Sequence, residues 1–225
     1  MHPDPERELS AEPEELSELL RGKGLGEAAL TALGLVSRAA FLPPDQRGRA
    51  HENRALPIGY GQTCSQPWMV AVVVQALGLR PGSTVLEVGA GSGYLAAVLR
   101  AAGADRVIAI ELVPELAARA RRNLNRADVS DVLVYAGDGR RGAPLGGSFD
   151  AVVVSATATE LAQSLLQQVA EGGCLVAPLL EEGHERLWRL ARRGSSWQRE
   201  DLGECRFVPL VGTDSRAAPL KATLP

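Results

Sequence analysis

The sequence predicts an α/β fold, namely a doubly wound, mostly parallel sheet of seven strands with an N-terminal helical and loop extension. Three observations predict it. From residue 67 onward, strand patterns alternate with helical patterns, as they do in parallel sheets that are covered on both faces. The strand patterns are nearly continuous runs of valine, isoleucine and leucine, which indicates burial on both faces. A glycine-rich turn joins the first of these strands to the next helix.

The first 66 residues predict two short helices followed by a long, ordered loop. Residues 11–35 have the leucine and alanine spacing of a helix, which glycines interrupt. Residues 41–66 contain three prolines and no periodicity, and a loop of this length in a compact domain is usually functional. We therefore expect an acidic N-terminal helical segment, residues 1–37, and a single domain, residues 38–225, whose first loop lies over a site.

The remaining elements follow in order along the chain. A helix is predicted from Pro67 to about Leu77, because the missing N–H of proline costs nothing in a first turn. The predicted strands are residues 84–89, 106–111, 132–137, 149–156, 173–179, 184–193 and 197–211. The predicted connecting helices are residues 94–103, 114–127 and 160–170. We expect an antiparallel member among the last two strands.

Composition limits the classes of function. The chain has 225 residues and a net charge of −3, which fits one globular domain and gives no basic signature for nucleic acid. Its apolar runs are far shorter than the roughly 20 residues of a membrane span, and its first residues lack the features of a signal peptide. Three widely spaced cysteines argue against a disulfide framework or a metal site. We expect a cytoplasmic monomer with no metal, nucleic-acid or membrane partner.

The stretch "VLEVGAGSGYLAAVL" predicts a cofactor site. Its glycines, Gly89, Gly91 and Gly93, lie between a strand and a helix, where small residues let the backbone approach a ligand. Glu111 ends the second strand of the unit, so its carboxylate can accept hydrogen bonds from both hydroxyls of a ribose. Asp138 ends the third strand and could accept from an adenine amino group.

The same pattern favours S-adenosylmethionine over a dinucleotide. A dinucleotide fingerprint reads G-x-G-x-x-G, but here the third glycine comes one residue early and Tyr94 follows it. Glu87 adds a second acid near the turn, which suits a sulfonium and an ammonium group better than a pyrophosphate. A nicotinamide oxidoreductase is disfavoured for the same reasons. The simplest alternative is a tight turn with solvated acids.

The stretch "GQTCSQP" places two nucleophile types, Cys64 and Ser65, just before the helix that begins at Pro67. The free N–H groups and the dipole of a helix N-terminus favour an anion. Ser65 could therefore donate a hydrogen bond to a substrate carboxylate. The alternative is that Ser65 or Gln66 caps the helix.

Six stretches resemble the protein-L-isoaspartate O-methyltransferase family. They are "RALPIGYGQTCSQPWMVA", "VLEVGAGSGYLAAVL", "GDGRRG", "FDAVVVSA", "GGCLVAPL" and "RFVPLVG". The resemblance implies a Rossmann-like methyltransferase sheet and methylation of the free α-carboxylate of L-isoaspartyl residues, with S-adenosyl-L-methionine as methyl donor. The ester would then close to a succinimide and begin repair of the damaged protein or peptide.

The resemblance also implies roles for individual residues. The expected catalytic residue is Ser65. The expected cofactor-binding residues are Thr63, Glu87, Gly89, Gly91, Ser92, Gly93, Glu111, Leu112, Asp138 and Gly139. The expected substrate-binding residues are Pro57, Ile58, Gly59, Cys64, Ser65, Phe207 and Val208.

Four features depart from the family pattern. Cys64 stands at a commonly aliphatic position, His51 and Asn53 replace a tyrosine and an aspartate, residues 157–166 lack a usual proline, and the acidic N-terminus has no counterpart. Two alternatives therefore stay open. One is an O-methyltransferase that acts on an aspartate carboxylate of one dedicated peptide. The other is a homologue that binds the cofactor without turnover.

Overall fold

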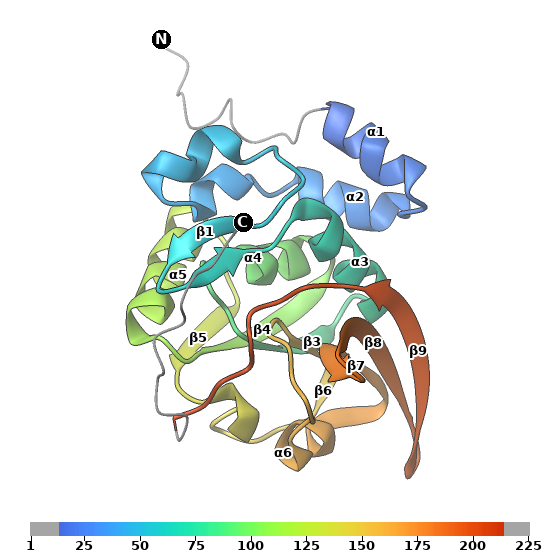
Figure 1. The fold of residues 1–225 in the computed structure, drawn as a ribbon. Coiled ribbons are helices and arrows are strands. Elements are labelled where there is room, and N and C mark those ends of the chain that lie inside the picture. The colour runs from blue at the N-terminus through green and yellow to red at the C-terminus, as the bar shows by residue number, and fades with distance from the viewer. Residues whose placement is uncertain (1–13, 214–225) are drawn as a thin grey trace.

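The computed structural model describes residues 14–213 and contains the predicted seven-stranded sheet (Figure 1). Its strands are β3 (Ser83–Val88), β4 (Ala104–Glu111), β5 (Val132–Ala136), β6 (Phe149–Val154), β7 (Val169–Glu181), β8 (His184–Arg193) and β9 (Ser196–Glu204). The spatial order is β5-β4-β3-β6-β7-β8-β9. The first five strands in this order pair in parallel, whereas β8 and β9 pair antiparallel to their neighbours.

The order of the strands creates a switch point beside β3. The chain runs from β3 to β4 and β5 on one side, and then returns to β6 and its neighbours on the other side. In open sheets of this kind, ligands bind outside the carboxyl ends of the strands at such a switch point. The fold therefore predicts a ligand site at the loops that follow β3, β4 and β6.

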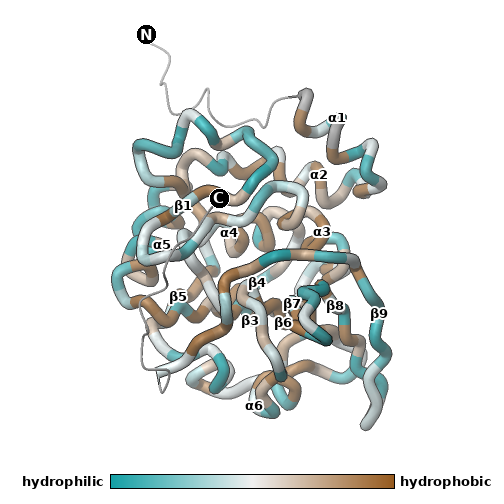
Figure 2. The backbone as a smooth tube through the Cα atoms, viewed as in Figure 1, coloured by the Kyte–Doolittle hydropathy of each residue, from teal (hydrophilic) through white to brown (hydrophobic). Residues whose placement is uncertain are grey.

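Helices cover both faces of the sheet. The helices α3 (Pro67–Leu77), α4 (Tyr94–Ala101) and α5 (Pro114–Arg126) cover one face, and α6 (Gln163–Gln167) with the turn η3 (Gly139–Arg141) covers the other. Along β3, Val85 faces α3–α5 while Leu86 and Val88 face α6, so adjacent residues fill two separate cores. Figure 2 shows hydrophobic residues gathered around the central strands, whereas β9 is hydrophilic along most of its length. Among residues 14–213, no helix combines the length and the apolar character needed to cross a membrane.

The N-terminal extension packs onto α3 and α4. The two predicted short helices are α1 (Glu14–Gly22) and α2 (Glu27–Gly34), and they join the same core as α3 through Leu16, Leu20, Leu30 and Leu33. Residues 1–13 of the predicted acidic segment, residues 1–37, lie outside the described residues.

The predicted loop at residues 41–66 contains more regular structure than expected. Two 3-10 turns, η1 (Arg38–Phe41) and η2 (Pro44–Arg49), are followed by a hairpin of β1 (Leu56–Gly59) and β2 (Gln62–Cys64). Leu56 and Ile58 point inward and alternate with exposed neighbours, which is the period of a half-buried strand. The segment is ordered, as predicted, but it is not a structureless loop.

Two predicted boundaries are wrong. The helix predicted at residues 160–170 is only the short α6, because Val169 already pairs with Phe149 as the start of β7. The strand predicted at residues 197–211 ends at Glu204, and the chain beyond it leaves the sheet. Both differences arise from pairings between distant parts of the chain, which a local pattern does not reveal.

Candidate active site

A cavity of about 350 Å³ opens at the carboxyl ends of the central strands. Its walls are the glycine turn after β3, the junction of β2 and α3, and the chain that follows β9. Most of the predicted site residues line it, namely Thr63, Cys64, Ser65, Glu87, Gly89, Gly91, Ser92, Glu111, Leu112, Gly139, Phe207 and Val208. The fold therefore brings the expected cofactor side and the expected substrate side together in one space.

The glycine turn is bound to the end of the neighbouring strand. The N–H of Gly89 donates to the carbonyl of Ile110 at 2.8 Å. Gly91 has a φ of +53°, and its α-carbon lies so close to Ile58 that an added Cβ would be 3.3 Å from that side chain. Gly93 lies outside the cavity lining and packs against Ala120 of α5. The turn thus keeps its backbone open toward the cavity.

Glu111 is a buried acid at the end of β4. One carboxylate oxygen accepts from the N–H of Gly91 at 2.8 Å, and the other accepts from the N–H of Val113 at 2.9 Å. A carboxylate has about four acceptor positions, so each oxygen can accept a further hydrogen bond. Glu111 therefore both orients the glycine turn and offers acceptors to a ligand in the cavity.

Glu87 is the second acid of the cavity and is 1% exposed. Neither carboxylate oxygen has a hydrogen-bond partner among the described residues. Burial raises the pKa of the Glu87 carboxyl well above its ordinary value, and the charge of Glu111 raises it further. A cation that enters the cavity beside Glu87 would reverse this effect and favour the ionised carboxylate.

Asp138 follows the third strand of the unit, β5, and its carboxylate bonds to groups of the protein itself. Its carboxylate pairs with the guanidinium of Arg140 at 2.7 Å and accepts from the N–H of Thr213 at 3.2 Å. The hydrogen bond from Arg140 lowers the pKa of Asp138 to about 2. Asp138 is outside the cavity lining, whereas Gly139 is in it, and a Cβ there would lie 2.5 Å from the side chain of Val88. The Asp138 carboxylate therefore anchors the chain around the site, and Gly139 forms the wall.

Ser65 lies in the cavity wall just before α3. The helix begins at Pro67, and its N-cap residue Gln66 makes no side-chain capping bond. The amide of Asn53 does so instead, since its Oδ1 accepts from the N–H of Trp68 at 3.0 Å. The alternative that Ser65 or Gln66 caps the helix is thus wrong. Within residues 14–213, no hydrogen bond engages the Ser65 hydroxyl, which leaves it available to a ligand.

The hairpin residues predicted to bind substrate do not line the cavity. Pro57 and Gly59 are exposed, and Ile58 is buried against the glycine turn. The alternation of β1 explains this, because it turns Ile58 inward and its neighbours outward. Cys64, by contrast, is a buried wall residue, as its small apolar thiol suggests.

The family model described as Protein-L-isoaspartate(D-aspartate) O-methyltransferase (PCMT) matches residues 11–215. The chain belongs to this family. The protein-L-isoaspartate O-methyltransferase of Methanoculleus marisnigri is 43% identical to it over 203 residues, which cover 89% of this chain and 92% of the relative. That of Methylorubrum populi is 45% identical over 194 residues, which cover 85% of this chain and 91% of the relative.

Solved structures of the family share the fold. One protein-L-isoaspartate O-methyltransferase structure is 26% identical with a TM-score of 0.80, and the match covers 88% of this chain and 66% of the solved chain. A Plasmodium falciparum protein assigned the same activity, solved with S-adenosyl-L-homocysteine, is 24% identical with a TM-score of 0.76. The match covers 88% of this chain and 97% of the solved chain.

In this member of the protein-L-isoaspartate O-methyltransferase family, two residues that support the cavity wall were not predicted from the sequence. Arg38 is 1% exposed and donates to four backbone carbonyls, including that of Cys64 beside Ser65. Asn123 of α5 donates to the carbonyl of Ser92 in the glycine turn at 3.0 Å. Each had a signal in the sequence, because each is a polar side chain within an otherwise apolar face.

Proposed function

We propose that this protein transfers a methyl group from S-adenosyl-L-methionine to the free α-carboxylate of L-isoaspartyl residues in proteins or peptides. A carboxylate oxygen bonds to the methyl carbon as the methyl–sulfur bond breaks, and the electron pair stays on sulfur. The products are a methyl ester, which starts repair through a succinimide, and S-adenosylhomocysteine. The observation that carries this proposal is the single cavity in which the available Ser65 hydroxyl faces the same space as the glycine turn and its two acids.

The cofactor side of the cavity suits S-adenosylmethionine. Its sulfonium supplies an already activated methyl group. The buried, unpartnered carboxylate of Glu87 fits a cationic ligand and fits a pyrophosphate poorly. Glu111 would accept hydrogen bonds from the ribose hydroxyls while it holds Gly91. The backbone of the turn and the wall at Gly139 would lie along the ligand.

The substrate side needs to position an anion rather than to move a proton. An α-carboxylate is ionised at neutral pH and is itself the nucleophile. The Ser65 hydroxyl would donate one hydrogen bond to it, close to the N-terminus of the 11-residue helix α3. The chain around Phe207 would exclude water from the reacting groups.

Two departures from the family pattern have structural roles within the chain itself. Asn53 caps α3, and an amide and a carboxylate can both do so. Thr157, in the segment without the usual proline, bridges to Pro209. Both departures therefore have a role in the fold, and neither requires a dedicated peptide substrate.

We further propose that the enzyme works as a cytoplasmic monomer without a nucleic-acid partner. Its three cysteines, Cys64, Cys174 and Cys205, form no disulfide, which fits a reducing compartment. Among residues 14–213, its exposed large hydrophobic residues belong to separate parts of the chain.

The role of Ser65 predicts a selective loss of transfer. Ser65→Ala is expected to lower kcat/KM for an isoaspartyl peptide by about 10–100-fold, because it removes one hydrogen bond to a charged group. The dissociation constant of S-adenosylmethionine should stay within about twofold. Radiolabelled methyl transfer, scored as base-labile ester, measures the first quantity and titration calorimetry the second.

Ser196→Ala is the matched control, because its hydroxyl donates to the carbonyl of Arg193 and both residues are outside the cavity lining. An equal loss of cofactor affinity in Ser65→Ala would show that Ser65 supports the cofactor site instead. Failure of the wild-type enzyme to esterify the peptide would reject the proposed function itself.

The burial of Glu87 predicts that this residue lowers the free energy of unfolding and strengthens cofactor binding. Because the pKa of Glu87 is raised in the folded state, the folded protein keeps a proton that the unfolded chain releases. The Glu87 carboxyl group therefore destabilises the folded state increasingly as the pH rises above the ordinary glutamate pKa of about 4.3. Glu87→Gln should therefore raise the free energy of unfolding at pH 7, because the amide cannot ionise. The gain should shrink as the pH falls toward 5, and the affinity for S-adenosylmethionine should fall.

Thermal unfolding of both proteins without ligand, at several pH values, checks the first part of this prediction. A gain that does not change with pH would contradict the assigned protonation. Glu115→Gln, at the start of α5 and outside the cavity lining, is the control.

A further inference from the structure

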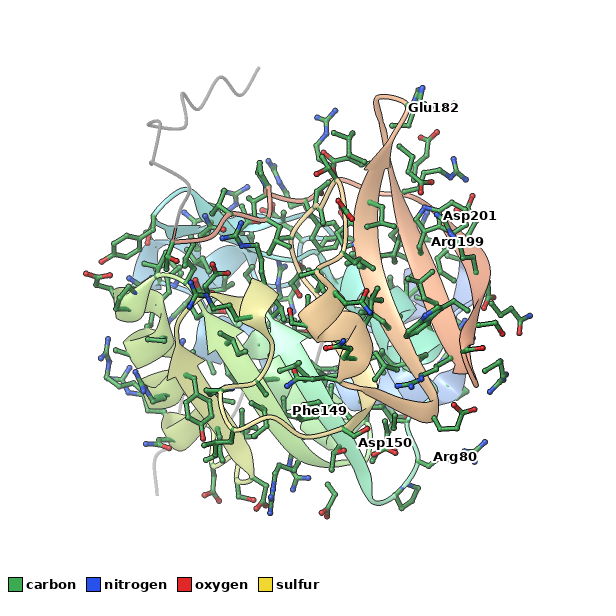
Figure 3. The ribbon with its side chains drawn as sticks, turned by 90° about the horizontal axis from the view of Figure 1, so that it is seen from below. Arg80, Phe149, Asp150, Glu182, Arg199 and Asp201 are labelled. Carbon is green, nitrogen blue, oxygen red and sulfur yellow. The ribbon has the colours of Figure 1, made fainter. Side chains whose placement is uncertain are left out.

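Residues 205–211, which we call the covering segment, leave the sheet after β9 and form one wall of the cavity. In Figure 1 this stretch runs from the end of β9 across the front of the central strands. Figure 3 shows the turn at Glu182 and the start of β6 at Phe149 and Asp150 on opposite ends of the sheet, and the covering segment crosses at the Glu182 end. A segment without strand partners needs other acceptors for its backbone N–H groups.

Glu185 of β8 provides two of these acceptors. The pairing of β8 with β9 ends at Arg186 and Glu204. Beyond that point, the backbone carbonyl of Glu185 accepts from the N–H of Cys205 at 3.1 Å, and its carboxylate Oε2 accepts from the N–H of Phe207 at 2.9 Å. The side chain thus extends the hydrogen-bonding edge of β8 by two residues.

The same oxygen also joins the covering segment to the chain after β6. The hydroxyl of Thr157 donates to Glu185 Oε2 at 2.9 Å. The backbone of Thr157 then bonds twice to the covering segment, donating to the carbonyl of Val208 at 2.8 Å and accepting from the N–H of Leu210 at 2.7 Å. Three separate parts of the chain therefore meet at one carboxylate oxygen behind the cavity wall.

We propose that Glu185 is a positioning residue for the methyl acceptor, and this rests on the proposed function. It acts on the cavity wall directly through the N–H of Phe207, and indirectly through Thr157, which bonds to the carbonyl of Val208. Glu185 itself is outside the cavity lining, so it is not a catalytic residue. Among residues 14–213, Glu185 hydrogen-bonds to Cys205, Phe207 and Thr157 but not to the glycine turn, so its loss should affect the acceptor and spare the cofactor.

Two substitutions of Glu185 separate its hydrogen bonds from its charge. Glu185→Ala removes the shared acceptor, and we expect KM for an isoaspartyl peptide to rise about tenfold or more. Glu185→Gln keeps one carbonyl oxygen that can accept from both Phe207 and Thr157, so KM should stay within about threefold of wild type. Thr157→Val should give an intermediate rise, because its backbone bonds remain.

The matched control is Glu181→Ala, which removes a carboxylate of the same hairpin that pairs with Arg199 and does not touch the covering segment. Two readouts are independent of turnover. In Glu185→Ala the amide of Phe207 should exchange hydrogen about tenfold faster or more, while the dissociation constant of S-adenosylmethionine stays within about twofold. A merely structural role would weaken cofactor binding as well.

The proposal is overturned if Glu185→Ala changes KM and Phe207 exchange no more than Glu181→Ala does. It is also overturned if Glu185→Gln raises KM for the peptide as much as Glu185→Ala does. A third contrary result would be a loss of cofactor affinity in Glu185→Ala as large as the rise in KM for the peptide. If the wild-type protein methylates no isoaspartyl peptide, the proposed function fails first. The exchange of the Phe207 amide then still shows whether Glu185 holds the covering segment.

Discussion

Glu111→Ala is expected to weaken the binding of S-adenosylmethionine by about 100-fold or more. The substitution removes the carboxylate that would accept hydrogen bonds from the ribose hydroxyls, each worth about 1.5–3 kcal/mol because one partner is charged. The N–H groups of Gly91 and Val113, which donate to this carboxylate at 2.8 Å and 2.9 Å in the wild type, would also lose their acceptor. The glycine turn would then lose its orientation as well as its neighbouring acceptor.

Titration calorimetry with S-adenosylmethionine and S-adenosylhomocysteine measures this loss. Glu115→Ala, four residues further along the chain and outside the cavity lining, should bind both as the wild type does. The loss should be similar for the two ligands, because both carry the same ribose. An unaltered affinity in Glu111→Ala would make the ribose assignment wrong.

Arg38→Ala is expected to cost about 3 kcal/mol or more of unfolding free energy, since it leaves buried carbonyls without partners. The guanidinium now donates to the carbonyls of Ala50 at 3.0 Å, Glu52 at 3.0 Å, Arg54 at 2.7 Å and Cys64 at 3.1 Å. It therefore holds together the chain from η2 to the residue before Ser65. The melting temperature should fall by about 6–12 °C, at about 2–4 °C per kcal/mol for a chain of this size.

Arg38→Lys is the informative companion variant. Lysine keeps the charge but has a single ammonium that cannot serve four separated carbonyls, so it should also be strongly destabilised. Arg47→Ala is the control, because Arg47 makes one long bond of 3.4 Å to the Leu42 carbonyl. Wild-type stability in Arg38→Lys would show that charge alone, and not the fan of hydrogen bonds, holds this region.

The parts of the fold with a strong local pattern were predictable from the sequence. Pro67 starts α3 because proline suits a first turn, and the strand at residues 84–89 is β3 within one residue at each end. The helix at residues 160–170 was not predictable in this way. Its last two residues begin β7 instead, through the pairing of Val169 with Phe149, a contact that no local pattern contains.

The same distinction holds for the site. Glu111 and the glycine turn belong to one strand–helix–strand unit, so the sequence brings them together directly. The contacts that support the substrate side join residues far apart. Asn53 caps a helix 15 residues later, and Glu185 holds an amide 22 residues later. Their side chains were unremarkable in the sequence, because only the folded chain shows which backbone groups lack a partner.

The central claim is that this cavity methylates the α-carboxylate of an isoaspartyl residue. Three peptides of identical sequence test it most directly, with isoaspartate, with aspartate, and with isoaspartate whose α-carboxylate is a carboxamide. The wild-type protein and labelled S-adenosylmethionine should give base-labile methyl ester on the first peptide only, and that peptide should then yield succinimide. Transfer to the aspartyl peptide or to the carboxamide, or to none of the three, would contradict the claim.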